Sequence, residues 1–240
     1  TRIALQAGVP QLSLPAETRD GLRWTLVRNE VEAHATETGW IGLYLEDGEP
    51  VTPGSLLARL GVRLFGAAIL HAGTGGNSLA ALAAALVFIA GIAGWFGFTA
   101  TGLVLCGIAW IVRRAAGLVM RVEQQTLALA APGWPREMVF GWLLDLTIIV
   151  ILTTSVPAIA SLALWQRAFA PLMLLSLFRL VPRVIDRGWS GWFADRLLLA
   201  LLLAFAAGAG VLNLTVAVLA TVIALTGILW PAARVQLTRV

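Results

Sequence analysis

The chain has no lysine and one cysteine, and only 12% of its 240 residues are charged. The lone Cys106 excludes an intrachain disulfide and a cysteine-based metal centre. So few charges, with 59% hydrophobic residues and a mean hydropathy of +0.85, exclude an ordinary soluble domain. All 17 basic residues are arginine, a composition typical of a GC-rich genome, and we attach no mechanism to it.

Common catalytic motifs are also missing. There is no P-loop, no CxxC and no ordered Ser-His-Asp set, and His34 and His71 have no companion metal ligands in the sequence. The pI near 10.9 does not indicate nucleic-acid binding, because the arginines lie at the ends of apolar runs. Topology and anionic lipid explain that placement. Membrane lipids are therefore the expected partners, and nucleic acid is not.

Two regions differ in composition. Residues 1–54 contain no spanning segment and are expected to form a small cytoplasmic N-terminal segment. They hold eight of the 13 acidic residues: Glu17, Asp20, Glu30, Glu32, Glu37, Glu46, Asp47 and Glu49. Residues 55–240 are the membrane domain. The sequence begins at Thr1 rather than methionine, so we expect either a missing start or the C-terminal part of a longer protein.

The membrane domain is predicted to be an all-α, polytopic bundle of six transmembrane helices that follows an N-terminal interfacial helix. Apolar residues and two arginines four positions apart, Arg59 and Arg63, predict the interfacial helix over 55–70. The spans are expected near 78–95, 98–121, 138–164, 167–182, 194–210 and 212–230. Connections at 95–98, 165–167 and 208–213 are so short that they predict tight antiparallel hairpins.

Arginines set the orientation. One side of the predicted bundle carries only Arg167. The positive-inside rule therefore places both termini in the cytoplasm, and we expect the membrane to be a bacterial inner membrane. The arginine-rich side carries Arg59, Arg63, Arg113, Arg114, Arg121, Arg136, Arg179, Arg183, Arg187, Arg196, Arg234 and Arg239.

Asp145 is a charge inside an apolar run, Met138 to Ala163, that is long enough to cross a bilayer. An acid at such a position costs about 2.5–3.5 kcal/mol on insertion scales. It therefore needs a partner of opposite charge, and its presence indicates a functional role. Arg113 and Arg114, which end the preceding apolar run, are the expected partners.

The residues around this charge resemble a known pattern. Arg113 to Arg121 contains Gly117 and ends in arginine, and the next span opens with Gly141 and Asp145. This is similar to the CDP-alcohol phosphotransferase family, whose motif is D-x-x-D-G-x-x-A-R followed by G-x-x-x-D-x-x-x-D. The resemblance implies six spans, cytoplasmic termini and an interfacial helix. It also implies four aspartates that bind a divalent metal, the last being the base that activates the acceptor hydroxyl.

The chain departs from that pattern at the metal ligands. Arg113, Ala116 and Ile149 stand at three of the four aspartate positions, and Met120 replaces the alanine. One aspartate beside arginines cannot hold a divalent cation, which needs several oxygen ligands. We therefore expect no catalytic residue, no metal and no cofactor. Mg²⁺ or Mn²⁺ would be needed only if the protein is an active enzyme.

Two interpretations of the motif remain. Residues 113, 116, 117 and 121 share one helix face, which is expected to face Asp145. The face then forms either a structural ion pair or a remodelled anion site built from Asp145, Arg113, Arg114, Gly117, Arg121 and Gly141. Further arginines are expected to contact lipid phosphate: Arg59, Arg63, Arg183, Arg187 and Arg196.

The resemblance implies a divergent CDP-alcohol phosphotransferase-like protein without metal-dependent catalysis. It would act as a lipid-binding protein or as a structural subunit, with other membrane subunits or a second copy as partners. The alternative is an active phospholipid or inositol-phosphate-lipid synthase that transfers a phospho-alcohol from a CDP-linked donor. A third interpretation is an unrelated six-span protein such as a small transporter, but the lack of other buried charges argues against ion coupling.

Overall fold

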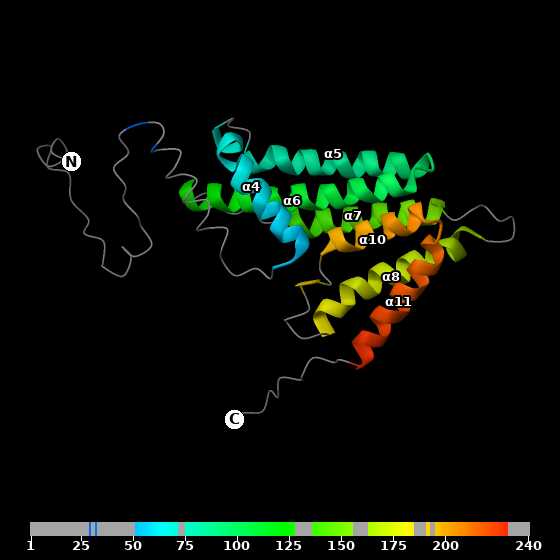
Figure 1. Ribbon diagram of the computed structural model, residues 1–240. Helices are drawn as coiled ribbons and strands as arrows, with labels where there is room; N and C mark the ends of the chain where they lie inside the picture. The colour runs from blue at the N-terminus through cyan, green and yellow to red at the C-terminus, as the bar shows by residue number, and fades with distance from the viewer. Residues whose placement is uncertain are drawn as a thin grey trace, which may run out of the picture.

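The structure is a computed structural model that describes residues 29, 32, 51–71, 75–127, 136–155, 163–184, 191–192 and 195–229. This part of the chain is all-helical, as predicted (Figure 1). The predicted N-terminal segment, 1–54, lies almost wholly outside the described residues. The helices are α4 (Pro53–His71), α5 (Gly75–Trp95), α6 (Thr99–Leu127), α7 (Arg136–Ser155), α8 (Leu164–Val184), α10 (Arg196–Gly208) and α11 (Leu212–Leu229).

Four of these helices are long and apolar enough to cross a membrane. They are Gly75–Trp95, Thr99–Arg121, Met138–Ser155 and Leu164–Val181, which correspond to the first four predicted spans. The apolar parts of α10 and α11, Arg196–Gly208 and Leu212–Thr226, are shorter. The chain is thus an integral membrane protein by its four long apolar helices.

Two of the three predicted hairpin turns are present. α5 and α6 are joined at Gly97, with φ +87°, and α10 and α11 at Gly210, with φ +72°. Glycine tolerates this left-handed conformation without the steric cost that other residues have. Backbone bonds close both turns, from Phe98 N to Ala93 O at 2.9 Å and from Val211 N to Ala206 O at 3.0 Å.

The third predicted turn, at 165–167, is wrong, because these residues lie in the first turn of α8. The side chain of Gln166 accepts a hydrogen bond from the backbone N–H of Ala163, 3.0 Å away, and this stabilises the helix start. The preceding span, predicted near 138–164, corresponds to α7, Arg136–Ser155, and its predicted continuation over 156–162 lies outside the described residues.

α4 crosses α6 steeply in Figure 1, and it packs on α6 through a buried stripe spaced four residues apart. Ala58 and Val62 lie on this stripe with 0% and 2% exposure. Its opposite side is apolar yet exposed, at Leu56, Leu60 and Leu64. α4 therefore presents an apolar outer face, and its placement at the membrane interface stays a prediction.

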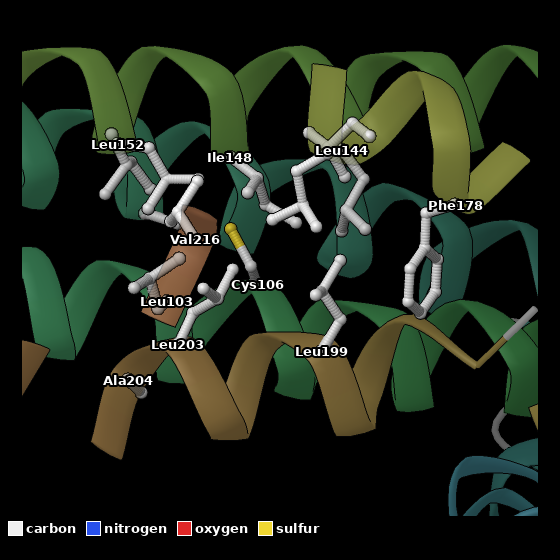
Figure 2. Close-up of a cluster of buried hydrophobic side chains, with 14 of the residues drawn as sticks. Leu103, Cys106, Leu144, Ile148, Leu152, Phe178, Leu199, Leu203, Ala204 and Val216 are labelled. Atoms are coloured by element: carbon white, nitrogen blue, oxygen red, sulfur yellow. The ribbon is translucent and has the colours of Figure 1, made fainter. Parts of the chain in front are cut away.

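The main core lies where α6, α7, α10 and α11 meet, and Figure 2 shows its centre. Leu103 and Cys106 of α6 pack there with Ile148 of α7 and Leu203 of α10, and all four are fully buried. Many large apolar side chains outside this core are exposed, such as Phe88 at 70%. Continuous exposed apolar surface on long helices is what a lipid-facing bundle presents.

Candidate functional site

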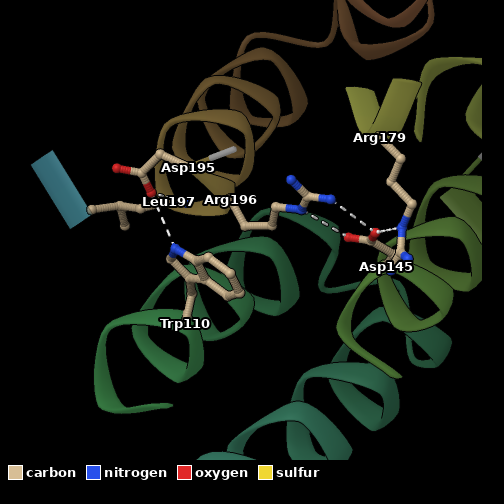
Figure 3. A network of polar contacts seen from close by, with 6 residues as sticks. All are labelled: Trp110, Asp145, Arg179, Asp195, Arg196 and Leu197. Carbon is tan, nitrogen blue, oxygen red and sulfur yellow. Dashed lines mark hydrogen bonds and ion pairs between the residues drawn. The ribbon is translucent and has the colours of Figure 1, made fainter. Parts of the chain in front are cut away.

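Asp145 lies on α7, and only 3% of it is exposed. Both carboxylate oxygens accept hydrogen bonds from arginines of two other helices (Figure 3). Arg179 of α8 donates from Nε to Oδ2 at 2.6 Å. Arg196 of α10 donates from Nε to Oδ1 and from Nη2 to Oδ2, both at 3.2 Å. One buried carboxylate therefore ties three helices together.

Arg113 and Arg114 were the expected partners of Asp145, but it bonds to Arg179 and Arg196 instead. The antiparallel packing of α7 on α8 brings Arg179 level with Asp145, and α10 begins at Arg196 directly beside them. Asp145 therefore faces α8 and α10 rather than the arginine end of α6. The sequence alone could not predict these partners of Asp145. It shows which residues lie at one end of the bundle but not which helices are neighbours there.

Aromatic rings cover the two guanidinium groups. Arg179 lies over the ring of Trp142, 3.5 Å from its centroid, and Arg196 lies over Phe178 at 5.4 Å. Trp142 is one helical turn before Asp145, and Phe178 directly precedes Arg179. Ring faces attract cations, so these contacts help to hold the two guanidinium groups beside the carboxylate.

The surroundings of Asp145 do not suit a divalent cation. Guanidinium groups occupy both of its oxygens, and they would repel a metal ion. No group of three His, Cys, Asp or Glu that could hold a metal occurs among the described residues. The other three motif positions carry Arg113, Ala116 and Ile149, none of which supplies a carboxylate.

The arginines of α6 gather at a different place. Arg113, Arg114 and Arg121 line a pocket between α4 and α6, together with Gly117, and the pocket and its mouth hold about 630 Å³ of open space. Arg59 of α4 forms part of the opposite wall. Four of the predicted site arginines thus surround one pocket, although the motif face was expected to meet Asp145. Ala116, expected on the same face, is fully buried, and its carbonyl lies against Gly76 of α5.

Two of these arginines are held against rings. Arg114 lies over Trp110 of the same helix, 5.1 Å from the ring centroid. Arg113, which is 7% exposed, lies over Phe140 of α7 at 5.8 Å. Stacked guanidinium groups have fewer rotamers available, so their N–H groups are partly oriented before any ligand arrives.

Asp195 is a second buried acid that sequence reasoning missed. It is 1% exposed and accepts three N–H groups, from Leu197 at 3.0 Å, Gly54 at 2.7 Å and Trp110 Nε1 at 3.1 Å. Figure 3 shows Asp195 beside Trp110 and Leu197. It caps α10 and also satisfies the first turn of α4. An aspartate directly before a long apolar run was the available signal, since that is where helix caps occur.

The remaining predicted residues are scattered. Arg63 is exposed on α4 and does not line the pocket. Gly141 lies beside Arg179, whose Nη2 is 3.9 Å from where a side chain would begin. The side chain of Arg183, at the end of α8, and all of Arg187 lie outside the described residues. Arg196, expected to contact lipid phosphate, is nearly buried and bonded to Asp145.

No family model, no curated protein and no solved structure matches this chain. The resemblance to CDP-alcohol phosphotransferases therefore stays a prediction from the residues of α6 and α7.

Proposed function

We propose that this integral membrane protein binds a phosphate-bearing group in the α4–α6 pocket, as a CDP-alcohol phosphotransferase-like protein without metal-dependent catalysis. The observation that carries the proposal is the convergence of Arg59, Arg113, Arg114 and Arg121 on one pocket. Four guanidinium groups from two helices therefore line the same pocket. Arginine is also the side chain best suited to grip phosphate, because its planar fork donates two parallel hydrogen bonds.

The wall of the pocket is well supported. Ser55, in the first turn of α4, also lines the pocket, and its hydroxyl is fixed by hydrogen bonds to the backbone of Thr52. Trp110 forms another part of it and is fixed through its indole N–H to Asp195. Asp195 also bonds to Gly54, so one buried carboxylate sets the position of α4 against α6. A binding site on rigid, cross-linked helices needs little ordering when the ligand arrives.

The lack of carboxylates argues for binding rather than metal-assisted transfer. At the motif positions where metal ligands would stand, Arg113 lines the pocket and Asp145 is bonded to two arginines. We place the arginine-rich side, with this pocket, at the cytoplasmic face of a bacterial inner membrane. The natural ligand would be a lipid phosphate or a pyrophosphate, and the protein would act as a lipid-binding or structural subunit.

Binding can be tested with the purified full chain in detergent and pyrophosphate as the probe. We expect Arg114→Gln to weaken the affinity about tenfold or more, since a hydrogen bond to a charged group contributes about 1.5–3 kcal/mol. Arg63→Gln is the matched control, because Arg63 is on α4 but outside the pocket. Calorimetric titration would measure both. An equal loss in the two variants, or no binding by the unaltered protein, would contradict the proposal.

Catalysis is tested separately. With Mg²⁺ or Mn²⁺ and a CDP-alcohol donor, we expect no release of CMP, because three of the four motif carboxylates are absent. Release that depends on the metal and is abolished by Asp145→Asn would instead establish the synthase alternative. Folding of Asp145→Asn would be checked by its elution volume and thermal midpoint.

A further inference from the structure

A second feature lies between α7 and α8. It is a groove with about 990 Å³ of open space. Most of its length is apolar, with Ile149 and Leu172 at one end and Leu146 in between. Asp145 and Arg179 line the other end, so the groove is apolar along its length and charged at one end. It shares no lining residue with the α4–α6 pocket.

The groove opens on an apolar surface. Trp142, Leu146, Leu172 and Leu180 line it and are 59%, 57%, 46% and 53% exposed. Both of its helices are long and apolar enough to span a membrane. Since the surface beside such helices is covered by lipid, a hydrocarbon chain is the neighbour that this groove meets.

Arg179 supplies the charged end. Its Nε is bonded to Asp145 and its flat face lies on Trp142, while 24% of the side chain is exposed. Among the described residues, its terminal Nη groups donate no hydrogen bond. These Nη groups are therefore hydrogen-bond donors held in place at the mouth of the apolar groove. Arg179 itself lies five residues before the end of α8. At 1.5 Å per residue this is about 7 Å from the helix end, a distance that a snorkelling arginine side chain can span.

We infer that the α7–α8 groove binds an anionic phospholipid, with one acyl chain along Leu146, Ile149 and Leu172 and the phosphate on the Nη groups of Arg179. Asp145 holds the guanidinium through Nε and so directs its remaining donors outward. The ion pair between Asp145 and Arg179 thus joins two helices and also orients the arginine that binds the lipid. This site is independent of the pocket between α4 and α6.

Thermal unfolding of the purified full chain in detergent tests the inference, with phosphatidylglycerol as the probe. Leu172→Trp fills the groove without touching Arg179, and Arg179→Lys keeps the charge but loses the fork. Leu201→Trp on α10 is the control, since Leu201 is equally exposed but lies outside the groove. We expect phosphatidylglycerol to raise the midpoint of the unaltered protein and of Leu201→Trp, and at least half of this rise to be lost in the other two variants.

Other probes separate the two parts of the ligand. Inorganic phosphate and diacylglycerol should each give less than half of the rise produced by phosphatidylglycerol. Diacylglycerol acting as well as phosphatidylglycerol would overturn the inference, since the charge would then be irrelevant. A full response in Leu172→Trp would also overturn it. A response lost in Arg114→Gln but kept in both groove variants would assign the lipid to the α4–α6 pocket instead.

Discussion

A carboxylate shared by two guanidinium groups is well suited to a buried site. Each oxygen of Asp145 has several acceptor positions, and Arg179 and Arg196 approach it from different helices. Their charged hydrogen bonds replace the water that burial removes, and the rings of Trp142 and Phe178 shield the open faces. Removing one member is then costly, because it leaves the others desolvated and unpaired.

Asp145→Ala should therefore lower the free energy of unfolding by about 3–5 kcal/mol, the usual cost of breaking one side of a buried pair. In double-mutant cycles, Asp145 should show coupling to both Arg179 and Arg196, because a second substitution removes a stranded charge. A cycle of Asp145 with Arg113 should be additive. Unfolding midpoints in detergent would measure each cycle. Strong coupling to Arg113, with none to Arg179, would contradict the arrangement seen here.

Asp195 works through neutral donors rather than through cations. Its three N–H partners belong to α4, α6 and α10, two of them at helix starts where backbone N–H groups otherwise lack partners. The positive ends of two helices thus meet at one carboxylate, which their dipoles favour. A side chain at Gly54 would begin only 2.5 Å from Oδ1 of Asp195, so glycine is required for this contact.

Gly54→Ala should push Asp195 away and loosen α4 from the bundle. We expect a loss of about 1–3 kcal/mol, the cost of leaving a buried polar group without its partners. Gly61→Ala, on the same helix with nothing within 4 Å, is the control and should be neutral or raise stability by about 0.5–1 kcal/mol. Proteolysis rates before α4 and thermal midpoints would report both changes. Equal effects of the two substitutions would refute this role of Gly54.

At the scale of helices, close backbone approach fixes the α5–α6 hairpin. A side chain at Gly102 of α6 would begin 2.9 Å from the carbonyl oxygen of Ala90 and 3.3 Å from the backbone nitrogen of Gly94, both on α5. Backbone atoms cannot swing aside as a side chain can. Small residues at such contacts allow the dispersion contacts that hold membrane helices together.

Gly102→Ala should consequently separate the two helices and cost about 1–3 kcal/mol, as overpacking does elsewhere. Gly208→Ala, at the end of α10 where nothing lies within 4 Å, should leave the unfolding midpoint nearly unchanged. Detergent unfolding monitored by tryptophan fluorescence would compare them. A midpoint for Gly102→Ala as high as that of the unaltered protein would show that the hairpin can adjust.

These elements also show what the sequence could and could not predict. The apolar runs gave the four long helices and two of the turns, because length and local glycine chemistry decide them. The need of Asp145 for a partner followed from its place in an apolar run. The identity of the partner depends on which helices are neighbours, which no local pattern contains. Arg179 and Arg196 were assigned to the correct end of the bundle but not to the charge they neutralise.

For the molecule as a whole, the number of membrane crossings depends on α10 and α11. α10 has 13 residues, about 20 Å of helix, which is less than a hydrocarbon core of about 30 Å. It begins partway into the bundle, however, because Arg196 meets Asp145, nine residues after the start of α7. From Asp145 to Ser155 is ten residues, about 15 Å, so α10 is long enough to reach the level where α7 ends.

Labelling with a membrane-impermeant maleimide on intact cells would show whether α10 and α11 cross the membrane. Cys106 is fully buried and is first replaced by alanine. Phe96→Cys and Val211→Cys, in the exposed turns α5–α6 and α10–α11, should both react from outside if six helices cross with the arginines inside. Val51→Cys, exposed before α4, should react only after permeabilisation. If Val211→Cys stays unlabelled while Phe96→Cys reacts, α10 and α11 do not reach the outer face. External labelling of Val51→Cys would reverse the orientation, and the arginine pocket would then face away from the cytoplasm.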